Sequence, residues 1–142
     1  SCGLLTCCAI RKGLEVCSDC SDYPCKRFDS EKSGYDSFVT HQKVFPNLNF
    51  IKNHGIDNFV EQQKIRIDIL TDLLNHFNDG RSKSFFCLGC ALLPLDKLNE
   101  IHQFTREQLS DSIDLKMKNK QIRDLFTTAA DSLNIRLTLR KK

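Results

Sequence analysis

The sequence has no tryptophan, one methionine and three prolines among its 142 residues, and it also lacks an excess of charge of one sign. Its 21 Lys and Arg residues face 18 Asp and Glu residues, which leaves a net charge of only +3. No apolar run approaches the roughly 20 residues that a membrane-spanning helix needs, and no apolar signal-peptide core opens the chain. These absences predict a soluble protein without a membrane partner, and the mild charge argues against nucleic acid as its target.

Cysteine is the residue type present in excess, with eight copies. A chain of 142 residues can build a hydrophobic core without disulfide bonds. Only Cys87 and Cys90 lie in its long C-terminal part. Close Cys-x2-Cys pairs suit a metal ion better than two separate bridges, although an even number of cysteines leaves a disulfide framework as the competing interpretation. The other six cysteines crowd the first 25 residues: Cys2, Cys7, Cys8, Cys17, Cys20 and Cys25.

The spacing of the N-terminal cysteines fits a tetrahedral zinc site. Such sites commonly take their ligands as two close pairs, each on a tight turn. Cys2 with Cys7 and Cys17 with Cys20 form two such pairs, and Gly13 helps the connection between them to turn. We therefore predict a metal-binding knuckle over residues 1–30, with Zn²⁺ as the ion.

Five or six thiols compete for four coordination places, so the sequence leaves the final set of four open. Cys25 is a candidate because Pro24 predicts a helix start there, and a helix N-terminus stabilises a thiolate. Cys8 is the expected spare, since adjacent cysteines rarely bind one ion. The predicted metal ligands are therefore Cys2, Cys7, Cys17, Cys20 and Cys25.

Iron–sulfur clusters also use four thiolates, and spacing alone does not separate them from zinc. We favour zinc because it is redox-inert and common in small structural knuckles. Four protein thiolates would fill the coordination sphere and leave no open position for water or substrate. We therefore expect a structural metal and no catalytic residue.

The rest of the chain, residues 31–142, is predicted to be a mainly α body of about five helices. Pro46 and Gly55 bound a short helix, and Pro94 stops another that begins near Ser82. Further helices are expected over 57–77, from Asp96 onward and over 114–134. We predict that the helix over 57–77 is central, with one apolar stripe made of Ile56, Phe59, Val60, Ile67, Leu70, Leu74 and Phe77.

Near the C-terminus the hydrophobic period changes from that of a helix to that of a strand. Ile135, Leu137 and Leu139 alternate with polar residues, which is typical of a half-buried strand. Its best partner within the sequence is the stretch 14–16. By contrast, Cys87 and Cys90 lie in an apolar segment, and we interpret them as core residues rather than as additional ligands.

Two motifs resemble those of a bacterial and archaeal family. The later one is Gly80-Arg81-Ser82-Lys83-Ser84-Phe85-Phe86-Cys87 running into Leu92-Leu93-Pro94. The first has a cysteine, four residues, a second cysteine, a Lys-Gly step, then Cys-x2-Cys and an aromatic residue, Pro and Cys. Here these positions are Cys2, Cys7, Lys12-Gly13, Cys17, Cys20 and Tyr23-Pro24-Cys25.

The family that these motifs resemble is catalogued as domain of unknown function three-seven-nine-five. The resemblance implies a cysteine-rich, zinc-binding cytoplasmic protein without a known activity. Leu4-Leu5 stand where members usually carry Ile-Arg, and the cysteine motif with which members begin has no counterpart here. The latter departure predicts a truncated chain.

Three functions remain open at this stage. The first is a zinc-stabilised module that binds another protein, which predicts a closed site and exposed apolar residues. The second is a thiol- or metal-dependent enzyme, redox or iron–sulfur, which predicts a pocket beside an accessible cysteine of lowered pKa. The third is nucleic-acid binding through Lys12, Lys26 and Arg27, which the interleaved acidic residues disfavour.

Overall fold

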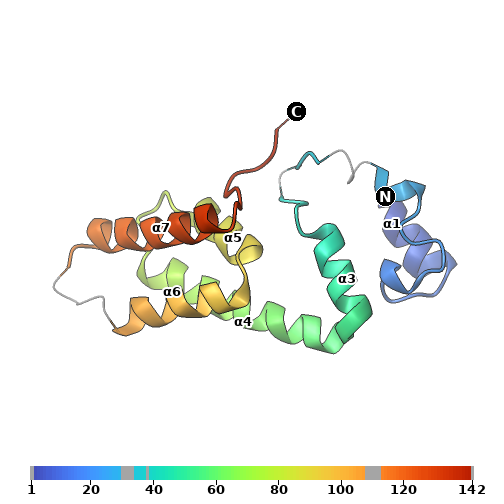
Figure 1. The fold of residues 1–142 in the computed structure, drawn as a ribbon, viewed down its shortest axis with the longest axis horizontal. Coiled ribbons are helices and arrows are strands. Elements are labelled where there is room, and N and C mark those ends of the chain that lie inside the picture. The colour runs from blue at the N-terminus through green and yellow to red at the C-terminus, as the bar shows by residue number, and fades with distance from the viewer. Residues whose placement is uncertain (1, 30–33, 38, 108–112, 142) are drawn as a thin grey trace. The chain divides into compact units, whose positions relative to one another are not determined.

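The computed structural model describes residues 2–29, 34–37, 39–107 and 113–141 (Figure 1). Within these ranges the protein is mainly helical, as predicted, and contains no strand. A π-helix over Thr6–Arg11 and two 3-10 turns over Cys17–Asp19 and Lys26–Phe28 lie in the N-terminal part. The α-helices are α1 (Gly3–Leu5), α3 (Val44–His54), α4 (Ile56–His76), α5 (Lys83–Leu92), α6 (Leu95–Glu107) and α7 (Leu115–Ser132).

The chain forms two compact units. The first comprises residues 1–60 together with 139–142, and the second comprises residues 61–138, so the division falls inside α4. The expected boundary between knuckle and body lies at residues 30–33, which are outside the described part of the chain. Below, residues 2–28 are called the cysteine segment.

The core of the second unit lies between α4, α5, α6 and α7. Phe86 of α5 and Phe126 of α7 are completely buried, and their ring centroids lie 6.0 Å apart. Gly89 permits this close approach, because a Cβ atom at that position would overlap the ring of Phe126. Cys90 belongs to the same core, as predicted, and burial raises the pKa of its thiol to about 12.

Polar side chains secure the ends of the helices around this core. Arg66 of α4 donates hydrogen bonds of 2.7 Å to the carbonyl oxygens of both Cys90 and Leu93, at the C-terminus of α5, where carbonyl groups lack partners within the helix. Asn119 of α7 donates to the carbonyl oxygen of Phe77 at 2.7 Å and lies 3.0 Å from the buried hydroxyl of Ser82. The loop between α4 and α5 is thereby fixed to α7.

The predicted apolar stripe of α4 is wrong at two positions. Val60 and Ile67 are 43% and 60% exposed, whereas Ile69 and Leu73, which the stripe omits, are 3% and 0% exposed. The helix carries apolar residues on more than one face, so local periodicity does not select the buried one. The core follows the line from Ile69 through Leu73 to Phe77, at intervals of four residues.

The predicted C-terminal strand is also absent, since residues 133–141 contain no strand in the structure. Ile135 and Leu137 pack against the core of the second unit. Further on, the backbone of Arg140 meets Asp36 of the first unit, with one hydrogen bond from its N–H to Asp36 Oδ2 at 2.7 Å and one from the N–H of Asp36 to its carbonyl oxygen at 3.0 Å. The backbone N–H and carbonyl groups of Arg140 thus bind the side chain and the backbone of Asp36, and do not pair with a strand.

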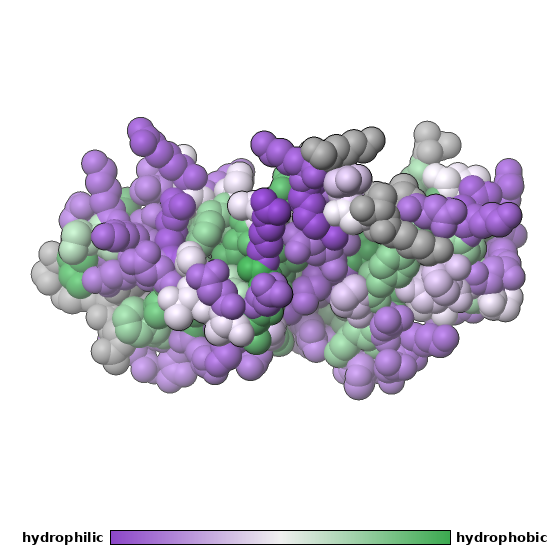
Figure 2. All heavy atoms as spheres, turned by 45° about the horizontal axis from the view of Figure 1, so that its top comes forward, coloured by the Kyte–Doolittle hydropathy of each residue, from purple (hydrophilic) through white to green (hydrophobic). Residues whose placement is uncertain are grey.

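The face drawn in Figure 2 is mainly hydrophilic, with hydrophobic residues showing between the polar ones. Two of the most exposed large apolar side chains, Leu5 at 60% and Ile10 at 74%, belong to the cysteine segment. None of the described helices combines the length and the apolar character needed to cross a bilayer.

Candidate thiol site

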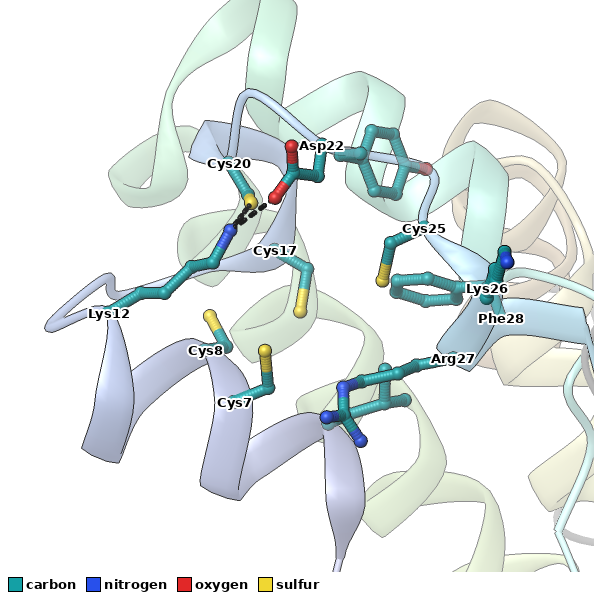
Figure 3. A pocket seen from close by; sticks show the side chains of 12 residues that line it. Cys7, Cys8, Lys12, Cys17, Cys20, Asp22, Cys25, Lys26, Arg27 and Phe28 are labelled. Atoms are coloured by element: carbon teal, nitrogen blue, oxygen red, sulfur yellow. Dashed lines mark hydrogen bonds and ion pairs between the residues drawn. The ribbon is translucent and has the colours of Figure 1, made fainter.

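The first arm of the site is built on an unusually wide helical turn. α1 continues directly into the π-helix, in which the N–H of Lys12 donates to the carbonyl oxygen of Cys7 at 3.1 Å, five residues back. In such a turn successive side chains diverge less about the axis than the roughly 100° of an α-helix. Cys7 and Cys8 therefore both reach the same cavity, although they are neighbours in sequence (Figure 3).

The second arm consists of two short turns. The 3-10 turn Cys17–Asp19 is closed by a hydrogen bond from the N–H of Cys20 to the carbonyl oxygen of Cys17 at 3.1 Å, which keeps these two cysteines on one turn. Cys25 directly precedes the second turn, Lys26–Phe28. Phe28 anchors that turn, because it is 2% exposed and its ring centroid lies 5.6 Å from that of Phe45 on α3.

These turns enclose a cavity of about 420 Å³ that five cysteines line: Cys7, Cys8, Cys17, Cys20 and Cys25. Their sulfur atoms point inward from the surrounding turns (Figure 3). Four of the five predicted ligands are thus brought together. Cys2, the fifth, is exposed and does not line the cavity. Cys8, the expected spare, is buried and lines it.

Cationic side chains surround the thiols. Lys12 Nζ lies 3.0 Å from Cys20 Sγ and 2.6 Å from Asp22 Oδ2, so Lys12 bridges a thiol and a carboxylate. The hydrogen bond from Lys12 lowers the pKa of Cys20, and an amide of Asp22 lowers it further. The same ammonium group lowers the pKa of Asp22. Ionisation of Cys20 is consequently favoured, and Lys12 is engaged by both Cys20 and Asp22.

The environment of Cys17 has the opposite effect. Burial raises its pKa to about 11, and a hydrogen bond with Cys8 raises it as well. The Cys8 thiol also donates to the carbonyl oxygen of Leu14 at 3.5 Å. Outside the cavity, the backbone amides of Leu5 and Leu4 lower the pKa of the exposed Cys2. Neighbouring thiols of one small segment therefore differ widely in their tendency to ionise.

The donor chemistry fits zinc, because the cavity presents only thiols as soft ligands and all eight cysteines are free. In the described residues, however, no group of three or more His, Cys, Asp or Glu side chains is already spaced to hold a metal ion. The five thiols share a cavity without forming a finished coordination shell. Binding an ion there would require their sulfur atoms to draw closer together.

The histidines and the remaining cysteines lie elsewhere. His76 Nδ1 and His102 Nε2 each lie 2.9 Å from a carboxylate oxygen of Asp72, and the contact of His102 connects α6 with α4. Cys87 is half-buried beside the buried Cys90 on α5. His102 is thus engaged in a contact between helices, and Cys90 belongs to the core of the second unit.

Comparison of the chain with known protein families, with curated proteins and with solved structures finds no match. The resemblance to a domain of unknown function therefore stays a prediction, and the site has to be interpreted from its own chemistry.

Proposed function

We propose that the protein is a cytoplasmic binding module whose cysteine segment is held in shape by a structural zinc ion. The observation that carries this proposal is the convergence of five thiols from three turns on one cavity. Cysteines placed only to fill a core would not need to gather in this way. The cytoplasm keeps such thiols reduced, and reduced thiolates are the ligands that zinc binds most readily.

Cys7, Cys17, Cys20 and Cys25 are the predicted ligands that line the cavity. A bound zinc ion would supply a redox-inert crosslink between the two arms of the segment. Four thiolates carry more negative charge than the ion neutralises. Lys12, Lys26 and Arg27 line the same cavity and offset this excess. The segment thus contains both the ligands and the charges that such a site needs.

A structural role is supported by the scarcity of other stabilising contacts. Among the described residues of the first unit, only Cys8, Phe28 and Ile51 are buried apolar side chains. Small segments that bury so little apolar surface commonly depend on a metal or on disulfides. Metal binding to such a segment contributes directly to its folding free energy.

The partner that we propose is another protein, bound through the cysteine segment. Leu5 and Ile10 are five residues apart on the helical run that carries Cys7 and Cys8, and both are exposed. Neighbouring exposed apolar side chains of this kind favour contact with a protein. Lys12, one of the cations that would contact phosphates, already forms an ion pair with Asp22. Nucleic-acid binding is therefore less well supported.

Elemental analysis of the full chain, purified without added metal, tests the proposal. We expect about one zinc per chain, and thiols that become reactive when a chelator removes it. The double variant Cys17→Ser/Cys20→Ser should lose the zinc, whereas Cys87→Ser, which lies outside the segment, should retain it. Absence of bound metal in the wild-type protein, or full occupancy in the double variant, would overturn the proposal.

A second candidate function is thiol chemistry at Cys20. It is supported by the Lys12 contact of 3.0 Å, the lowered pKa and the adjacent cavity of about 420 Å³, which together match the expectation for an enzyme. Rapid, selective alkylation of Cys20 in the zinc-loaded protein would favour it over a closed structural site. Iron with visible absorbance would instead indicate an iron–sulfur protein.

A further inference from the structure

We infer that Cys8, and not Cys2, belongs to the set of thiols that binds the metal ion. This inference rests on the proposed zinc site and changes its membership. Sequence spacing favours Cys2, because it pairs with Cys7 and because adjacent cysteines seldom bind one ion. Three observations from the structure point the other way.

The first observation is the position of the two thiols. Cys8 is 9% exposed and lines the cavity that Cys7, Cys17, Cys20 and Cys25 also line. Its sulfur points inward beside those of Cys7 and Cys17 (Figure 3). Cys2 is exposed and lies outside this lining.

The second observation is the placement of Cys8 relative to a predicted ligand. The sulfur atoms of Cys8 and Cys17 are turned into the same cavity from its two arms (Figure 3). An ion bound by Cys17 would therefore lie near Cys8 as well. For Cys2, the described contacts are with its own helical turn, where its carbonyl oxygen accepts hydrogen bonds from the N–H and the hydroxyl of Thr6.

The third observation removes the objection to adjacent ligands. In an α-helix, neighbouring side chains diverge by roughly 100°, which separates their sulfur atoms. Cys7 and Cys8 lie in the π-helix Thr6–Arg11, where the wider turn reduces this divergence. Leu14 closes the end of this run, its N–H donating to the carbonyl oxygen of Cys8 at 3.0 Å. The backbone thus presents both thiols to one cavity.

Thiol footprinting of the full-length wild-type protein tests the inference without a mutation. Each cysteine is alkylated with an isotope-coded reagent, once in the zinc-loaded protein and once after chelation, and the rates are compared by mass spectrometry. We expect the rate at Cys8 to rise at least about tenfold on chelation, and the rate at Cys2 to change less than about twofold. A large rise at Cys2 with no change at Cys8 would overturn the inference while leaving the zinc site in place.

Matched variants give a second measurement. Cys8→Ala keeps a small apolar side chain in a buried position and removes only the thiol, and Cys2→Ala is its control. Competition with a chromophoric chelator should show zinc affinity at least about tenfold lower for Cys8→Ala and unchanged within about twofold for Cys2→Ala. The reverse order contradicts the inference. If the wild-type protein binds no zinc, the proposed function fails and this assignment fails with it.

Discussion

The two units of the protein are stabilised by different means. Of the fifteen buried apolar side chains among the described residues, twelve belong to the second unit and three to the first. The second unit therefore has the core that hydrophobic burial requires. The first unit has few buried apolar side chains, and its contacts include ion pairs and a cavity that thiols line. If the proposed zinc site is correct, we expect the first unit to be more sensitive than the second to metal removal and to pH.

Metal removal should produce the largest difference in stability between the two units. Chelation of the zinc-loaded protein is expected to release the amides of residues 2–28 to rapid hydrogen exchange while α5, α6 and α7 stay protected. If the proposed zinc site is correct, the free energy at stake is on the order of 10 kcal/mol, as for small zinc-dependent folds. Hydrogen exchange followed by mass spectrometry measures both units in one experiment.

Repeating the hydrogen-exchange experiment at several pH values gives a sharper test of the zinc site. Because the pKa of Cys17 is raised to about 11, a proton must leave that thiol when a metal ion binds, so zinc affinity should fall as the pH falls. Equal protection of the cysteine segment with and without chelator would contradict the proposed contrast between the units.

The second unit should instead be sensitive to packing. Gly89→Ala places a methyl group against the ring of Phe126, which is completely buried and cannot move aside. We expect a loss of about 1 to 3 kcal/mol in the free energy of unfolding, measured by urea denaturation. Helix propensity alone would predict a gain of roughly 1 kcal/mol, so the sign of the change decides between the two effects.

A compensating substitution serves as the control for this variant. Phe126→Leu in the Gly89→Ala background frees space beside the new methyl group and should recover part of the lost stability. Zinc content should be unaffected in both variants. A metal loss caused by Gly89→Ala would show that the two units are not stabilised separately.

The buried carboxylate of Asp36 makes the first unit sensitive to acid. Burial alone would raise its pKa, but hydrogen bonds from the side chain and backbone of Arg140 and from the N–H of His41 lower it to about 2. Because the pKa in the folded protein is below the ordinary value of 3.8, the stabilisation is complete above about pH 4 and is lost as the pH falls toward 2.

Asp36→Asn tests this contribution. Arg140 remains 30% exposed, so we expect a modest loss of about 1 to 2 kcal/mol near neutral pH. The difference in stability between the wild type and the variant should shrink between pH 4 and pH 2, as followed by thermal unfolding. A difference that stays constant over this range would show that the charge of Asp36 does not stabilise the fold.

The smallest expected effect concerns Lys12. Lys12→Met removes the ammonium group that lowers the pKa of Cys20, so in the metal-free protein the thiol should ionise at higher pH and react more slowly with iodoacetamide at pH 7. Lys26→Met is the matched control, since Lys26 lines the same cavity. Similar changes in both variants would indicate a general effect of positive charge rather than the specific contact at 3.0 Å.

Much of the helical body could be predicted because its signals are local. Gly55 adopts a positive φ of 84° where α3 ends, and Pro94 lies two residues after the last residue of α5, as their conformational preferences require. The buried positions of α7, Ile122 and Phe126 among them, also follow from helical periodicity. The choice of face on α4 did not follow, because that choice depends on where the partner helices lie.

The candidate site also has some features that local sequence signals predict and others that depend on tertiary packing. Four of the predicted ligands line the cavity. Cys17 and Cys20 were paired correctly because they share a short turn, and such turns are encoded locally. The place of Cys8 was missed because it depends on a π-helical turn, for which the sequence carries no recognisable signal. The predicted strand failed because no partner strand exists for residues 135–139 among the described residues.

The sequence by itself determined that the protein is mainly helical, where several helices begin and end, and that thiols gather near the N-terminus. These properties arise from interactions within a few residues along the chain. Tertiary structure alone decided that Cys8 lines the cavity and Cys2 does not, which face of α4 is buried, and that Arg140 binds a carboxylate 104 residues earlier. Such contacts depend on how distant segments pack together, and no local pattern specifies that packing.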